Sequence, residues 1–266
     1  MTYAQVLRLR RALLVYGTVV GGLFLIVVLF GHLPNATFDV ETTFGHHATK
    51  SVSSINLSGL LFFTGWVTII FATVISTSLN RENDGVEMVW TKPIARGRLA
   101  FWYIALDFGA ILVAYAFAVA LCVLALASFG LLKYVSVDGR TIPTLVIGLG
   151  VAFMWYGLLQ GLSSWQRGGR GGMVIGLSWA AAFVLTSLAG ATAGGGLPLL
   201  HSLFTALDVV NPVAYFSSYT LSGYGAHASP VLPQALAGTL MRSVATWGIG
   251  ILGCAAAIAG WKRLEV

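Results

Sequence analysis

Charged residues are scarce in this sequence. Asp, Glu, Lys and Arg make up 9% of the 266 residues, whereas roughly a quarter is usual in a soluble domain. Hydrophobic residues make up 57%, and the mean hydropathy is +0.85. These values exclude an ordinary soluble domain. There are only two cysteines, Cys122 and Cys254, and both lie in apolar stretches, so we expect small buried hydrophobic side chains and not a secreted disulfide framework.

Motifs of membrane-bound enzymes are also missing. The sequence has no HExxH pair and no cysteine–histidine cluster with zinc spacing. The segment GHHATKS at 45–51 lacks the glycine that precedes the lysine of a phosphate-binding loop. Ser163 and Ser178 have no histidine within an apolar block to act as a base. These absences favour a protein that is not an enzyme and holds neither a metal nor another cofactor of its own.

The sequence does have long apolar blocks. A helix needs about 20 apolar residues to cross the hydrocarbon core of a bilayer. Asp107 is the only charged residue inside the six blocks, which cover residues 12–33, 57–79, 99–132, 142–166, 171–196 and 243–261. We therefore predict one all-α polytopic membrane domain over residues 1–266, with six transmembrane helices.

The basic residues predict the topology of these helices. Eleven of the 15 Lys and Arg residues flank the blocks on one side: Arg8, Arg10, Arg11, Arg81, Lys92, Arg96, Arg98, Arg167, Arg170, Lys262 and Arg263. Lys and Arg are enriched in cytoplasmic loops, so we expect both termini to be cytoplasmic. The net charge of +6 is then a topology signal and not a nucleic-acid-binding surface.

Two segments outside the blocks leave alternatives open. MTYAQVLRLRR at the N-terminus either forms a short basic helix on the inner membrane surface or is simply a charged flank of the first span. The segment 197–240 is divided by Pro212, Pro230 and Pro233, which predicts short re-entrant or interfacial helices. A seventh span near 209–221 is the competing interpretation.

Glycine pairs four residues apart allow helix backbones to approach closely in lipid. They occur at Gly17 and Gly21, at Gly157 and Gly161, and in the series Gly168, Gly172 and Gly176. Packing within the chain and a subunit interface both explain them. Asp107 likewise has two interpretations, a structural anchor or a polar contact at the inner mouth of a transport pathway.

The segment NRENDGVEMVWTKPIARGR at 80–98 is the most charged part of the sequence and lies on the predicted cytoplasmic side. Val86, Val89 and Trp90 form one apolar face at helical spacing, and acids lie at or before the start of that helix. Pro93 ends it. The pattern predicts a short amphipathic helix at the inner surface, able to lie on lipid or in the groove of a partner.

This segment resembles the first cytoplasmic loop of ABC-2-type transporter permeases. The similar residues are Arg81-Glu82, then Glu87, the apolar Met88-Val89-Trp90, and Thr91-Lys92-Pro93-Ile94-Ala95-Arg96. The family has Gly-Thr where this chain has Asp84-Gly85.

The resemblance implies a permease subunit of an ATP-binding cassette exporter in the bacterial cytoplasmic membrane, without enzymatic activity of its own. The partners it implies are a separate pair of ATP-binding subunits, which bind ATP and Mg²⁺, and a second permease copy or homologue. It also implies that the loop is a coupling helix on the ATPase, formed by Glu82, Glu87, Val89, Trp90, Pro93 and Arg96.

A different class of function rests on the histidines. His32, His46, His47, His201 and His227 all fall on the predicted outer side. Imidazole suits copper or zinc, so the alternative is a membrane-embedded metal-handling protein or enzyme that uses these residues.

Overall fold

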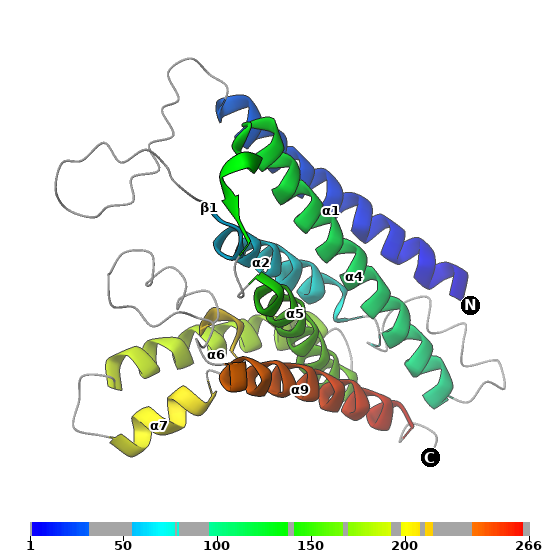
Figure 1. Cartoon of the computed structure of the whole chain (residues 1–266). Coiled ribbons are helices and arrows are strands. Elements are labelled where there is room, and N and C mark those ends of the chain that lie inside the picture. Colours follow the sequence, from blue (N-terminus) through cyan, green and yellow to red (C-terminus); the bar gives the residue numbers. More distant parts are fainter. Residues whose placement is uncertain are drawn as a thin grey trace.

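The structure is a computed structural model that describes residues 2–31, 55–77, 79, 96–137, 141–166, 170–192, 198–207, 211–214 and 236–262. Within these ranges the chain is almost entirely helical (Figure 1). Six long helices carry the fold: α1 (Thr2–Gly31), α2 (Leu57–Ile75), α4 (Arg96–Ser128), α5 (Thr141–Ser164), α6 (Gly171–Thr192) and α9 (Leu236–Lys262). A shorter helix, α7 (Pro198–Leu207), follows α6.

Five of these helices are long and apolar enough to cross a membrane, namely α1, α4, α5, α6 and α9. Helix α2 has 19 residues, and Phe63–Ile75 is the apolar stretch among those whose side chains the structure describes. Helices of this length and composition are those of a multi-pass membrane protein, so the predicted helical membrane fold is confirmed at that level. The count of six spans, with α2 as the sixth, stays a prediction.

The helix ends differ from the apolar blocks where polar residues continue a helix. Helix α1 runs without a break from Thr2, so the first basic residues belong to the same helix as the apolar span. The alternative of a separate basic helix on the membrane surface is therefore wrong. Helix α9 begins at Leu236, seven residues before the block at 243, and includes Arg242. Helix α4 ends at Ser128, and Gly130 then takes the left-handed conformation (φ 66°) before the 3-10 turn η1 (Leu131–Tyr134).

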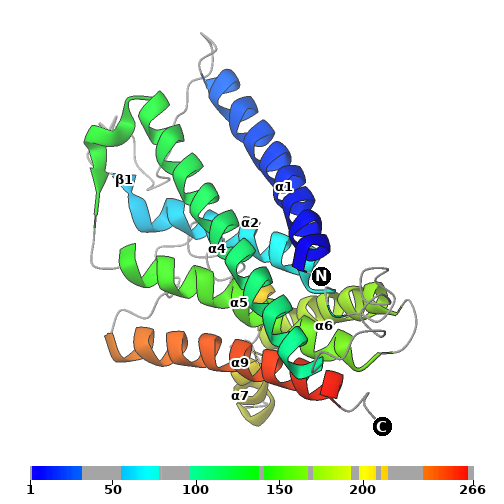
Figure 2. The same ribbon diagram turned by 90° about the vertical axis from the view of Figure 1, so that its right-hand side faces the viewer.

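Successive long helices alternate in direction (Figures 1 and 2). The start of α1 meets the end of α2, where Arg8 Nη2 donates to Thr77 Oγ1 at 3.4 Å. The end of α5 meets the same place, because Ser163 Oγ donates to the Ser76 carbonyl at 3.3 Å. The end of α9 joins them through Trp261 and Leu79. The start of α1 and the end of α9 therefore lie at one end of the bundle. The predicted cytoplasmic orientation of the termini stays a prediction.

The opposite end carries a minimal sheet. Strand β1 (Ile55–Asn56), just before α2, pairs in parallel with β2 (Val135–Ser136), just after η1. This pairing links the start of α2 to the end of the α4 segment.

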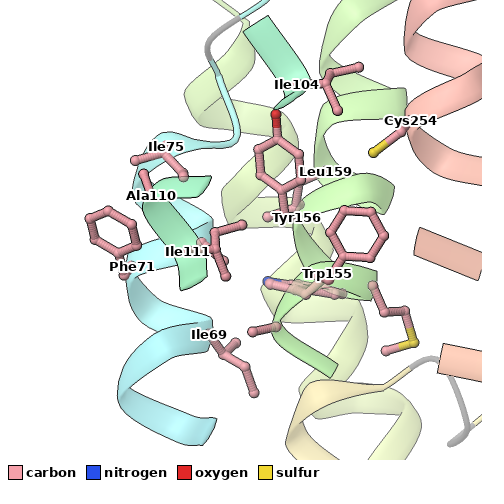
Figure 3. Packing of buried hydrophobic residues seen from close by; sticks show 14 of the residues in the cluster. Ile69, Phe71, Ile75, Ile104, Ala110, Ile111, Trp155, Tyr156, Leu159 and Cys254 are labelled. Atoms are coloured by element: carbon pink, nitrogen blue, oxygen red, sulfur yellow. The ribbon is translucent and has the colours of Figure 1, made fainter. Parts of the chain in front are cut away.

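Helix α5 is the centre of the bundle. It buries 17 of its 24 residues, whereas α6 buries three of its 22. Tyr156 and Leu159 of α5 are fully buried, and they share one hydrophobic cluster with Ile75 of α2 and Ile111 of α4 (Figure 3). The outer faces of α1 and α6 expose large apolar side chains, as expected for helices that contact lipid tails.

Close glycine contacts join α5 to α9. A Cβ on Gly157 would overlap the backbone of Gly250, and a Cβ on Gly253 would overlap the backbone of Gly157. Gly161 likewise lies against the backbone of Gly253. The pair Gly157 and Gly161 thus packs within the chain. By contrast, nothing lies within 4 Å of the Cβ positions of Gly21, Gly172 and Gly176.

Part of the segment 197–240 is described. Helix α7 packs beside α6 (Figure 1). Asn211 Nδ2 donates to the Ala182 carbonyl and to Thr186 Oγ1 of α6, both at 2.8 Å, and its Oδ1 accepts from the Val213 amide at 2.9 Å. Pro230, Pro233 and most of the competing span at 209–221 lie outside the described residues.

Candidate functional site

Most residues of the predicted coupling helix lie outside the described residues: Glu82, Glu87, Val89, Trp90 and Pro93. Arg96 is the first residue of α4. The structure does describe both flanks of this segment, Leu79 after α2 and Gly97 in the first turn of α4. The flanks show where the charged connection between α2 and α4 is attached.

Both flanks contact the last turn of α9. The Trp261 indole Nε1–H donates to the Leu79 carbonyl oxygen at 2.9 Å, and both side chains are buried. The next residue, Lys262, lays its aliphatic chain over Gly97, where a Cβ would lie 2.5 Å from Lys262 Cε. Residues 79 and 97 are thus held together by two consecutive residues 160 or more positions further along the chain.

We call this part of the bundle the basic end, defined by the contacts among Arg8, Thr77, Leu79, Gly97 and Lys262. Its cations reach solvent or headgroups, since the side chains of four Arg residues and of Lys262 are exposed: Arg10, Arg11, Arg98, Arg170 and Lys262. Phe101 and Trp102, one turn into α4, are also half-exposed. Aromatic residues next to cations are typical of a membrane–water interface.

Asp107 lies eleven residues after Arg96, a rise of about 16 Å along α4. Its side chain is 0% exposed. Gln5 Nε2 of α1 donates to Oδ1 at 2.8 Å, and the Tyr156 hydroxyl of α5 donates to Oδ2 at 2.7 Å. Each carboxyl oxygen therefore has its own donor from a different helix, and α1, α4 and α5 are joined at one buried point.

A buried carboxylate is stable only when it is hydrogen-bonded. The two hydrogen bonds come from different helices, so these contacts fix the relative positions of α1, α4 and α5. Sequence reasoning singled out Asp107 but not its partners. Gln5 lies in the basic N-terminal flank, and Tyr156 is one of several aromatic residues in an apolar block, so neither stood out.

The histidines are mostly outside the described residues, including His32, His46, His47 and His227. His201 lies in α7, with Nδ1 3.5 Å from Thr192 Oγ1. Across the described ranges, no three His, Cys, Asp or Glu side chains are grouped so that they can hold a metal ion. The metal-site alternative therefore stays a prediction about the remaining segments.

Neither a family model, nor a curated protein, nor a solved structure matches this chain.

Proposed function

We propose that this chain is the transmembrane subunit of an ATP-binding cassette exporter, and that it moves a substrate across the cytoplasmic membrane using ATP hydrolysed by a separate subunit. The observation that carries the proposal is the attachment of the charged 80–95 segment. Its two flanks are fastened to the end of α9, at the end of the bundle where both termini and the exposed cations gather. This placement suits a segment that meets a soluble partner.

The proposed mechanism requires that a movement of the segment becomes a movement of the helices. ATP and Mg²⁺ are bound by the partner subunits and close their dimer. That closure shifts the segment, and the flanks at Leu79 and Gly97 carry the shift into α2, α4 and α9. Coupling of this kind needs contacts that differ between two states. A segment fixed at both ends transmits such a difference better than one that is free to rearrange.

We assign the docking contacts to Glu82, Glu87, Val89 and Trp90 of the segment and to Arg96, the first residue of α4. Trp90 is the expected anchor, since a large aromatic side chain buried in a partner's pocket tends to dominate the energy of an interface. We expect Glu87 to contact the partner through its charge, so reversing that charge would place a cation where the partner accommodates an anion.

The test uses the full chain, tagged and purified in mild detergent from its source organism. We expect an ATP-binding protein to co-purify, and the purified complex to hydrolyse ATP. Trp90→Ala and Glu87→Lys should reduce the amount of that protein recovered, or uncouple its hydrolysis from transport, by about tenfold. Trp102→Ala is the matched control, because Trp102 is a half-exposed tryptophan of α4 outside the segment.

Two outcomes would contradict the proposal. One is the absence of any ATP-binding protein with the native chain, together with activity of the isolated chain. The other is equal recovery and equal transport in Trp90→Ala, Glu87→Lys and the control.

A further inference from the structure

The last turn of α9 contacts both flanks of the α2–α4 connection, through Trp261 and Lys262. Docking of the connection on a partner does not by itself require these two contacts. We infer that Trp261 and Lys262 anchor the α2–α4 connection to α9, and that α9 and α5 move as one unit when a partner displaces this connection. The inference rests on the proposed function for its partner. The anchoring itself is a property of the chain alone.

Trp261 is a specific anchor because its hydrogen bond is buried. The indole ring is 2% exposed and Leu79 is 0% exposed. The Leu79 carbonyl lies beyond the last turn of α2 and accepts the indole N–H at 2.9 Å. Water cannot readily replace a donor in such a position. Loss of the indole N–H therefore removes a hydrogen bond to the buried Leu79 carbonyl that water does not restore.

Lys262 adds a contact of a different kind. Its methylene chain crosses Gly97, and the absence of a Cβ at this position makes room for it. Lysine often lies along an apolar surface while its amine stays in water, and Lys262 is exposed as a whole. The adjacent residues Trp261 and Lys262 therefore connect α9 to the end of α2 and to the start of α4.

Two glycines earlier in α9 explain how a displacement would reach the centre of the bundle. Gly250 and Gly253 contact the backbone of α5 at Gly157. Backbone atoms in direct contact cannot absorb a shift by changing rotamer, whereas long side chains can. A displacement of the end of α9 is therefore transmitted to α5, the helix that is packed most completely inside the bundle.

The alternative is that movement travels only along the covalent chain, through α2 and α4. Trp261→Phe separates the two possibilities. It keeps an aromatic ring at the position and leaves the covalent connection intact, but it removes the N–H donor.

Helix α5 provides a matched control. The Trp165 indole N–H, at the end of α5, donates to the Ala256 carbonyl of α9 at 3.3 Å. Trp165→Phe thus removes the same kind of hydrogen bond to a backbone carbonyl, at a half-exposed site where the acceptor, Ala256, belongs to α9 and not to a flank of the connection.

The first measurement is hydrogen–deuterium exchange on the purified chain without a partner. In Trp261→Phe, we expect amides of peptides spanning residues 76–100 to exchange about fivefold faster than in the native chain, the factor given by the loss of one typical hydrogen bond. Trp165→Phe should leave these peptides unchanged. Equal exchange in the native chain and in Trp261→Phe would overturn the anchoring.

The second measurement uses the complex with the co-purified ATP-binding subunit, with and without a non-hydrolysable ATP analogue. In the native complex and in Trp165→Phe, the analogue should change exchange in peptides from both the connection and α9. In Trp261→Phe, the subunit should remain bound and the change in α9 should fall by about fivefold. If the change in α9 persists in full, the covalent route is sufficient and the inference is wrong.

Lys262→Ala gives an independent test if Trp261→Phe fails to fold, because Lys262 is exposed and its truncation leaves the core intact. In Lys262→Ala, we expect the analogue-dependent change of exchange in α9 to fall by less than in Trp261→Phe. An unchanged response in α9 would count against the inference. If no ATP-binding subunit co-purifies with the native chain, the proposed function fails, while the first measurement still decides whether α9 anchors the connection.

Discussion

Removing the Asp107 carboxyl should destabilise this protein more than removing any single neutral hydrogen bond. In Asp107→Ala, the Gln5 amide and the Tyr156 hydroxyl both lose the oxygen to which they donate. Each buried donor left without a partner costs about 1–3 kcal/mol. The two together give an expected loss of about 2–6 kcal/mol.

Tyr156→Phe removes one of the two donors and leaves the carboxylate with the other. This variant removes one hydrogen bond where Asp107→Ala removes at least two, so the loss should be smaller than for Asp107→Ala. Tyr115→Phe is the matched control, since the Tyr115 hydroxyl donates to a neutral acceptor, the Leu145 carbonyl, at 3.0 Å. There we expect a loss of about 1 kcal/mol.

Thermal unfolding in detergent, followed by tryptophan fluorescence, measures these differences. For a chain of this size, 1 kcal/mol shifts the Tm by roughly 2–4 °C. Asp107→Ala should then lower the Tm by roughly 5–20 °C, and Tyr115→Phe by roughly 2–4 °C. Because Asp107 and Tyr156 share one interaction, the double variant should be less destabilised than the sum of the single variants. Additive losses, or a Tm for Asp107→Ala no lower than for Tyr115→Phe, would show that the carboxyl does not join the three helices.

Two further predictions concern packing. Gly253→Ala should lower the Tm by an amount equivalent to about 1–3 kcal/mol, because its Cβ meets the backbone of Gly157. The control is Gly248→Ala on the same helix, where the new Cβ has open space and the effect should be neutral or stabilising. Equal effects of the two variants in thermal unfolding would contradict the close α5–α9 contact. Asn211→Leu removes two hydrogen bonds that hold residues 211–214 on α6 and a third, local one from the Val213 amide. Hydrogen exchange at the Val213 amide should therefore rise severalfold while exchange in α5 stays unchanged, and unchanged exchange at Val213 would show that Asn211 does not hold this segment.

The helices could be predicted because apolar blocks long enough to span lipid have few alternatives to a helix. Their ends could not be predicted as well. Hydropathy detects the apolar part of a helix, and polar residues such as Arg8 and Arg242 continue a helix without changing its backbone. The continuous α1 and the early start of α9 both follow from this.

The central position of α5 was not visible in the sequence. In lipid, a helix that faces the bilayer and one that is buried in the bundle are both apolar, so hydropathy does not separate α5 from α6. The available signal was its content of small and polar residues, including Gly157, Gly161 and the fully buried Gln160. Of these residues, only the glycines have a spacing that indicates close helix packing.

The candidate site shows the same limit. Asp107 stood out because a charge inside an apolar block is costly. Its donors Gln5 and Tyr156 lie 102 and 49 residues away, and Trp261 lies 182 residues from Leu79. Such pairings are produced by the packing of the bundle, and no local pattern of residues encodes them.

These long-range contacts divide the bundle into parts with different mechanical roles under the proposed function. Trp261 and Lys262 attach the connection to α9, the glycine contacts attach α9 to α5, and Tyr156 attaches α5 to Asp107 of α4 and through it to Gln5 of α1. Helix α6 contacts this series through side chains such as those of the Trp155–Trp179 ring pair, which joins α5 to α6. A movement that enters at the basic end would therefore displace α9, α5, α4 and the start of α1 together, while α6 can respond by rearranging its side chains.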